Sequence, residues 1–242
     1  MIGPHFVRMV RNLVGLGAVA LGLGTMPALV SRPVLATAAI RIVINVPSRT
    51  LYLYRGQSLL HHYPVAVGRS STPTPRGEFV ITQKAVWGDG FGTRWMRFSA
   101  PWGIYGIHGT NRPWSVGLAV SHGCVRMYNR NVEQLYALVS VGTPVVVEGP
   151  TPLVRIRRPL NPGAIGQDVV ELQRLLRLAG VYPGALNGIY QASAEEAVRK
   201  FQLTVGMPVT GIASLETVRN LLAYTRSAGP SGYLTPAGRW AW

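Results

Sequence analysis

The single cysteine of the chain lies in a segment whose residue types can support nucleophilic catalysis. Cys124 follows His122 and Gly123, and a second histidine, His108, stands upstream of it. A thiol becomes a strong nucleophile when a nearby base or cation favours the thiolate, and either histidine could supply that base. Gly123 puts no side chain beside the thiol, so backbone N–H groups can approach a developing oxyanion.

The two histidines stand in different relations to the cysteine. In an extended segment His122 and Cys124 would share one face, but Gly123 between them indicates a tight turn. His108 is too far along the chain for a local contact, so a neighbouring strand or loop must bring it to the thiol. The residue types alone leave both histidines open as the base.

Other chemistries fit this half of the chain less well. Zinc needs three or four ligands, and no CxxC or HxxxH pair accompanies the two histidines and the cysteine, so we expect no metal and no other cofactor. A glycosidase or a Ser–His–Asp hydrolase needs well-placed carboxylates. A Cys–His site tolerates their scarcity, because a backbone carbonyl can orient the histidine. The acids of this half are Glu78, Asp89, Glu133 and Glu148.

The N-terminus predicts export. Arg8 and Arg11 precede an uncharged apolar run from Leu13 to Val30, and small residues follow at 36–39. This order is typical of a secretory signal, and the run is also long enough to remain as a membrane anchor, so residues 1–38 are expected to be one or the other. A lone cysteine in an exported chain is a buried residue, an intermolecular bridge or a reactive thiol. The histidines and glycine around it favour the reactive thiol.

The net charge of +15 predicts a polyanionic partner. Export argues against nucleic acid, which leaves an anionic cell envelope as the expected surroundings.

Residues 40–149 carry the patterns of short β-strands that would hold the thiol and the histidines. The expected strands are 41–46, 50–54, a partner after the turn at 55–57, 63–67, 78–82 and 145–147. A loop rich in Gly, Pro, Ser and Thr occupies 68–77, and only 131–139 looks helical. The stretch 86–105 combines glycines with aromatic residues, which predicts either core aromatics or a mobile flap over a cleft.

A shift in composition marks a second unit. Residues 150–162 are rich in Pro and Arg without periodicity, which predicts a linker. Three amphipathic helices are expected within 163–224: one at 168–179, one opened by a capping box at 193–196, and one capped by Ser214. The unit has neither His nor Cys, which favours a binding domain. The tail 225–242 is rich in Gly and Pro and is expected to be loose.

The motifs resemble the L,D-transpeptidase catalytic domain, the YkuD-type family. Asn131 stands where that family usually has aspartate, and asparagine caps helices nearly as well. The matching segments are Ser121-His122-Gly123-Cys124-Val125-Arg126-Met127 with His108-Gly109-Thr110 upstream, Gly68 followed by Thr74-Pro75-Arg76-Gly77-Glu78-Phe79, and 131–136. The helical unit resembles the peptidoglycan-binding domain 1 family at 166–173, 186–190, 197–202 and Gly211, with Asn187 where that family often has aspartate.

The resemblance implies a mainly β catalytic domain at 40–149, an L,D-transpeptidase-like β-sandwich with one short helix, and a small all-α three-helix peptidoglycan-binding domain. It also implies that Cys124 attacks the stem-peptide carbonyl before a terminal D-Ala. His108 would be general base and acid, oriented by the carbonyl of Gly109. His122, Gly123 and Cys124 would line the oxyanion hole. The implied substrate-binding residues are Arg126, Ser121 and Thr110.

Three functions remain open under this resemblance. An amine of a second stem could resolve the thioester and form a cross-link, or water could resolve it, which would make an L,D-carboxypeptidase. A non-catalytic scaffold would only hold the polymer. The predicted partner is peptidoglycan rather than nucleic acid, with membrane contact only through an uncleaved N-terminal segment.

Overall fold

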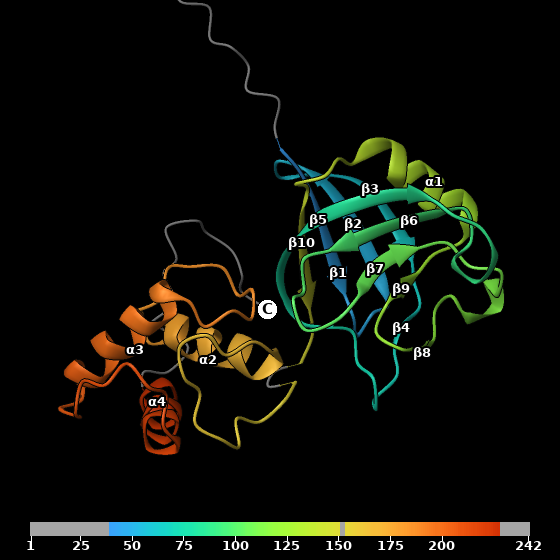
Figure 1. Ribbon diagram of the computed structural model, residues 1–242. Coiled ribbons are helices and arrows are strands. Elements are labelled where there is room, and N and C mark those ends of the chain that lie inside the picture. Colours follow the sequence, from blue (N-terminus) through green and yellow to red (C-terminus); the bar gives the residue numbers. More distant parts are fainter. Residues whose placement is uncertain (1–38, 151–152, 228–242) are drawn as a thin grey trace, which may run out of the picture. The chain divides into compact units, whose positions relative to one another are not determined.

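The computed structural model describes residues 39–150 and 153–227 (Figure 1). The predicted signal or anchor at 1–38 and most of the predicted tail lie outside the described residues. Within the described ranges, no helix combines the length and the apolar character needed to cross a membrane.

The first part of the chain folds into a curled sheet with one α-helix (Figure 1). The sheet has the order β3-β2-β1-β10-β5-β6-β7-β9, and β4 pairs with β8 in a separate ladder. Helix α1, Asn129–Leu138, contacts β6 and β7. The strands are β1 Ile40–Asn45, β2 Thr50–Arg55, β3 Ser58–Pro64, β4 Val67–Gly68, β5 Gly77–Val86, β6 Arg94–Phe98, β7 Tyr105–His108, β8 Ala119–Ser121, β9 Val125–Arg126 and β10 Pro144–Glu148. This confirms the mainly β catalytic domain with one short helix.

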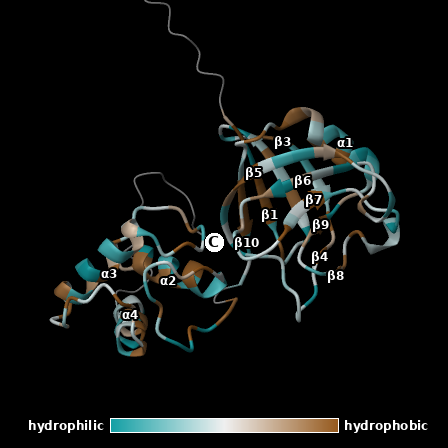
Figure 2. Cartoon of the chain, viewed as in Figure 1, coloured by the Kyte–Doolittle hydropathy of each residue, from teal (hydrophilic) through white to brown (hydrophobic). Residues whose placement is uncertain are grey.

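The core of the sheet lies on its central strands. Strand β1 pairs with β2 on one side and runs parallel to β10 on the other. Ile42, Val43 and Ile44 are all buried, so this strand is a continuous apolar run and does not alternate between apolar and polar residues. Strand β2 does alternate, with Leu51 and Leu53 buried between half-exposed residues. Figure 2 shows β1 as one of the hydrophobic strands.

Two strand predictions need correction. The stretch 86–105 is not all loop, because β6 pairs with both β5 and β7 and buries Trp95 and Phe98. The glycines at 88, 90, 92 and 103, which flank this strand, make it hard to recognise from the local sequence. The strand expected at 63–67 is divided: β3 ends at Pro64, which has no N–H to continue a ladder, and β4 begins at Val67.

The C-terminal part confirms the three-helix unit, with α2 at Gln167–Leu178, α3 at Ala192–Thr204 and α4 at Leu215–Ser227. Ser214 caps α4 as expected, because its hydroxyl accepts the N–H of Thr217 at 3.1 Å. The prediction of a capping box at 193–196 is wrong, because α3 already begins at Ala192. The residue before it, Gln191, makes no side-chain capping hydrogen bond.

The predicted limits of this unit also change. Leu160, which the sequence places in the linker, is fully buried in the helical core and pairs its backbone with Ala213. The helical unit therefore starts within the predicted linker. Helix α4 runs to Ser227, so the first residues of the predicted tail are helical.

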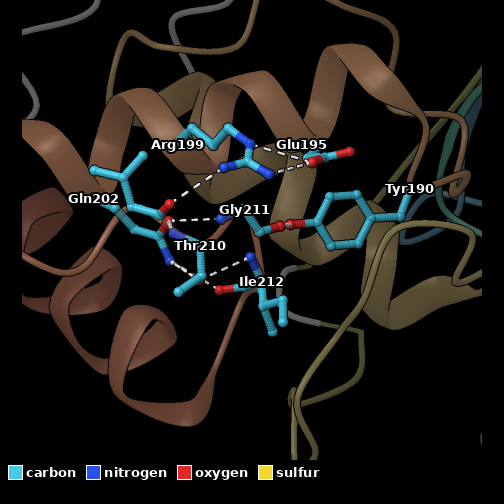
Figure 3. A network of polar contacts seen from close by, with 8 residues as sticks. Tyr190, Glu195, Arg199, Gln202, Thr210, Gly211 and Ile212 are labelled. Atoms are coloured by element: carbon cyan, nitrogen blue, oxygen red, sulfur yellow. Dashed lines mark hydrogen bonds and ion pairs between the residues drawn. The ribbon is translucent and has the colours of Figure 1, made fainter.

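Two buried glutamines tie the loops of this unit to its helices. Gln202 on α3 accepts the N–H of Gly211 at 3.0 Å and donates to the carbonyl of Ile212 at 2.9 Å (Figure 3). Gln173 on α2 accepts the N–H of Gly188 at 2.9 Å in the same way. Each helix therefore fixes the loop that follows it through one amide group.

Candidate active site

Strand pairing brings His108 to the segment that carries the thiol. Strand β7 runs parallel to β9, with Ile107 opposite Val125 and His108 opposite Arg126. Cys124 immediately precedes β9, and the N–H of Met127 donates to the carbonyl of His108 at 2.8 Å. The expectation that a neighbouring strand supplies this histidine is confirmed.

The imidazole of His108 is held in one tautomer. The ring is 3% exposed, and its Nδ1–H donates to the carbonyl of Gly109 at 2.5 Å. Phe91 packs edge-on against the ring and Trp95 lies tilted beside it, with centroid distances of 5.1 and 5.6 Å. With Nδ1 as donor, Nε2 carries the lone pair. The Gly109 carbonyl thus occupies the predicted orienting position.

Burial is the main influence on both reactive groups. The pKa of His108 falls from its ordinary value of 6.5 to about 4, chiefly because of desolvation. The charge of Arg126 acts in the same direction, and the carbonyls of Gly109 and Phe91 oppose it. Desolvation raises the pKa of the Cys124 thiol, against the opposing effects of the Gly106 N–H and Arg126. At neutral pH the resting site therefore contains a neutral thiol and a neutral imidazole.

The thiol points toward the backbone of β7 and the loop before it. Its Sγ–H donates weakly to the carbonyl of Ile104, at 3.9 Å, rather than to the imidazole. Catalytic hydrogen bonds are often long or unformed before substrate binds. The structure thus places His108 on β7 and Cys124 in the loop that leads directly into the adjacent strand β9.

The loop that presents the thiol is shaped by Ser121 and Gly123. The Ser121 hydroxyl is buried, donates to the carbonyl of Cys124 at 2.5 Å and accepts the N–H of Gly123 at 3.1 Å. Gly123 has a φ of +113°, and a Cβ there would lie 2.7 Å from Cε1 of Tyr105. Glycine is required on both counts. Because both polar groups are used within the loop, a substrate contact of Ser121 and an oxyanion contact of Gly123 stay predictions.

Thr110 is also occupied by the protein itself. It is 4% exposed, and its hydroxyl accepts the N–H of Arg112 at 3.0 Å. Its own N–H donates to Oδ1 of Asn129 at 3.0 Å. Its role in substrate binding stays a prediction, and Asn129 is a residue that the sequence reasoning missed.

A hollow lies next to the Cys124 loop, and exposed His122 contributes to its wall. Thr72 ties the 68–77 loop to this region, because its hydroxyl donates to the carbonyl of Ser121 at 3.0 Å. The sequence indicated the aromatic stretch 86–105 but not which of its residues line the hollow. The lining includes Ser71, Thr72, Pro73, Trp102, Tyr105 and His122.

Known protein families identify the class of this fold and site. The L,D-transpeptidase catalytic domain (YkuD) matches residues 39–147, and a peptidoglycan binding domain (PG_binding_1) matches residues 165–221. A protein of Bacillus licheniformis named L,D-transpeptidase YkuD is 47% identical over 112 residues, which are 46% of this chain and 67% of the relative. Its namesake in Bacillus subtilis is 41% identical over 112 residues, with the same coverage of both chains.

Solved structures include an L,D-transpeptidase from Mycobacterium smegmatis, with 26% sequence identity and a TM-score of 0.41, covering 46% of this chain and 59% of that one. The similarity to the two Bacillus relatives places the chain in the YkuD L,D-transpeptidase family, which is an enzyme family. The chain also carries a peptidoglycan binding domain. Both families expected from the motifs are confirmed.

Proposed function

We propose that this chain is a cysteine-dependent L,D-transpeptidase that cross-links peptidoglycan stem peptides through a thioester on Cys124. The observation that carries the proposal is the β7–β9 pairing. It brings a buried imidazole, fixed by the Gly109 carbonyl, alongside the loop that bears the only cysteine of the chain. A Cys–His pair with an oriented base is the arrangement that acyl transfer requires.

The first half-reaction forms the thioester. Sγ attacks the carbonyl carbon that links a diaminopimelate-type third residue to the terminal D-Ala, and the thiol proton passes to Nε2 of His108. The carbonyl oxygen becomes an oxyanion, for which we propose the backbone N–H groups of the 122–124 segment as donors. The C–N bond then breaks, the leaving amine takes the proton from His108, and D-Ala departs.

The second half-reaction transfers the acyl group. An amine of another stem peptide attacks the thioester and gives its proton to His108. A C–N bond forms, the C–S bond breaks, and Sγ recovers the proton. If water replaces the amine, the same site acts as an L,D-carboxypeptidase.

Arg126 gives the substrate a way to activate the base. Its positive charge lowers the pKa of His108 in the resting site. A substrate carboxylate paired with its guanidinium would cancel that charge. Substrate binding would then make His108 a stronger base, and it would also remove the effect by which Arg126 lowers the pKa of the Cys124 thiol.

The remaining parts of the chain fit work at the cell wall. The peptidoglycan binding domain would keep the enzyme on the polymer and raise the local concentration of stems. The net charge of +15 suits an anionic envelope. We propose that residues 1–38 direct export, as a cleaved signal or a retained anchor, and that the enzyme works outside the cytoplasm.

Mass spectrometry of muropeptides after incubation with purified protein tests the reaction. Dimeric products with a tripeptide donor would support transpeptidation, and loss of D-Ala alone would indicate the carboxypeptidase. Cys124→Ala should abolish either product while keeping the fold. An unchanged muropeptide profile with the unaltered protein would refute both activities and leave the scaffold.

A further inference from the structure

The peptide unit between Gly109 and Thr110 is held at both ends by side chains. Its carbonyl accepts the Nδ1–H of His108, and its N–H donates to Oδ1 of Asn129 at 3.0 Å. The C=O and N–H of a trans peptide point in opposite directions and move together as one plane. A rotation of this plane would therefore break both hydrogen bonds at once.

The side chain of Asn129 fits a slot that two glycines create. A Cβ added to Gly92 or to Gly109 would collide with Oδ1 of Asn129. Gly92 also has a φ of +63°, a conformation that favours glycine. The absence of side chains at both positions thus gives the amide oxygen access to the Thr110 N–H.

Asn129 is carried by a rigid element. It is the first residue of α1, and this helix is anchored by Val132 and Leu135, both fully buried. Met127 lies between β9 and the start of this helix. Its N–H donates a hydrogen bond to the carbonyl of His108 at 2.8 Å. Residues 127–129 therefore hold both peptide units that flank Gly109, the residue whose carbonyl orients the His108 ring.

We propose that Asn129 is a positioning residue for His108, acting through the Gly109–Thr110 peptide to keep Nδ1 protonated and Nε2 free to accept the thiol proton. This inference rests on the proposed Cys–His reaction. A neutral amide suits the role, because it accepts a hydrogen bond without adding a charge to the site. An aspartate would accept the same bond but would favour the imidazolium.

The charged and titratable groups around His108 define what a pH profile can report. The positive charge of Arg126 on β9 acts on the His108 ring, and Cys124 directly precedes that strand. Asp89 belongs to the short helix Asp89–Phe91, whose Phe91 packs against the ring. A carboxylate at position 129 would add a negative charge opposite in effect to Arg126.

Nitrogen-15 NMR of histidine-labelled full-length protein tests the positioning role directly. The chain has five histidines, and the His108 signals are assigned by comparison with His108→Gln. The unaltered protein should show a hydrogen-bonded Nδ1–H. Asn129→Ala should add the Nε2–H tautomer and speed exchange of the Nδ1 proton. Asn131→Ala, two residues further along the same helix, should leave the His108 signals unchanged.

The kinetic measurement uses acylation by a stem tetrapeptide that ends in D-Ala. Asn129→Ala should slow acylation by about tenfold, the effect expected when one hydrogen bond that orients the base is lost, with KM changed less than about twofold. Asn129→Asp should recover most of the rate at neutral pH and move the low-pH limb of the profile upward.

Two results would overturn the role of Asn129. One is an Asn129→Ala protein that is folded and keeps the His108 tautomer and acylation rate of the unaltered protein. If that variant does not fold, an unmoved low-pH limb in Asn129→Asp overturns it instead. The NMR arm needs no substrate, so an unaltered protein that fails to acylate would refute the proposed function without deciding the role of Asn129.

Discussion

The buried neutral imidazole of His108 should make the stability of the fold depend on pH. The folded state holds the pKa of this residue at about 4, whereas the unfolded chain returns it to about 6.5. Between these values the unfolded state binds a proton that the folded state excludes. The free energy of unfolding should therefore fall as the pH falls through this window, and the effect should be complete below about pH 4.

The magnitude follows from the difference between the two pKa values, which corresponds to about 3 kcal/mol at full development. The ring is 3% exposed, so solvent screening reduces this value little. His108→Gln removes the titration while keeping a side chain of similar size. The variant should lose less stability than the unaltered protein as the pH is lowered from 7 to 4.

Urea unfolding followed by tryptophan fluorescence at several pH values provides the measurement. The quantity of interest is the difference in free energy of unfolding between the two proteins, because other titrating groups contribute to both and cancel. Between pH 7 and pH 4, the free energy of unfolding of the unaltered protein should fall by about 2–3 kcal/mol more than that of the variant. Parallel pH curves for the two proteins would show that His108 is not held neutral by burial.

Two substitutions and one labelling experiment test the site and the helical unit. Gly123→Ala forces a Cβ toward Tyr105 at a positive φ, and should cost about 1–3 kcal/mol in urea unfolding and slow acylation; a fully stable, active variant would contradict the strain at this turn. Ser214→Ala removes the cap of α4 and should lower the free energy of unfolding by about 1 kcal/mol, and an unchanged value would contradict the cap. Iodoacetamide should label Cys124 slowly at pH 7, with a rate still rising above pH 9, because burial raises the pKa of the thiol; a plateau by pH 8 would contradict this.

Local sequence patterns were sufficient for the parts of the fold that depend on neighbours along the chain. Strand β1 follows from a run of β-branched residues, strand β2 from alternating β-branched and aromatic residues, and the cap at Ser214 from a serine directly before a helix. Strand β6 was missed because glycines flank its five residues and its stability comes from pairing with β5 and β7, which are remote in the local pattern. Leu160 was assigned to a linker for the same reason, since only the folded unit buries it.

The residue types and their spacing indicated the chemistry that we propose for this protein. A thiol–imidazole pair was the best interpretation of one cysteine near two histidines with few carboxylates, and the spaced motifs indicated the family. The placement and the protonation states of Cys124 and His108 depend on contacts that form only in the folded chain. The parallel pairing of β7 and β9 puts His108 next to the strand that follows Cys124. Burial keeps both the imidazole and the thiol neutral before substrate binds. The role of Asn129 can be recognised only in the folded chain, where the first residue of α1 lies against Gly92 and Gly109. Hydrogen bonds between remote segments leave no periodic pattern in a sequence.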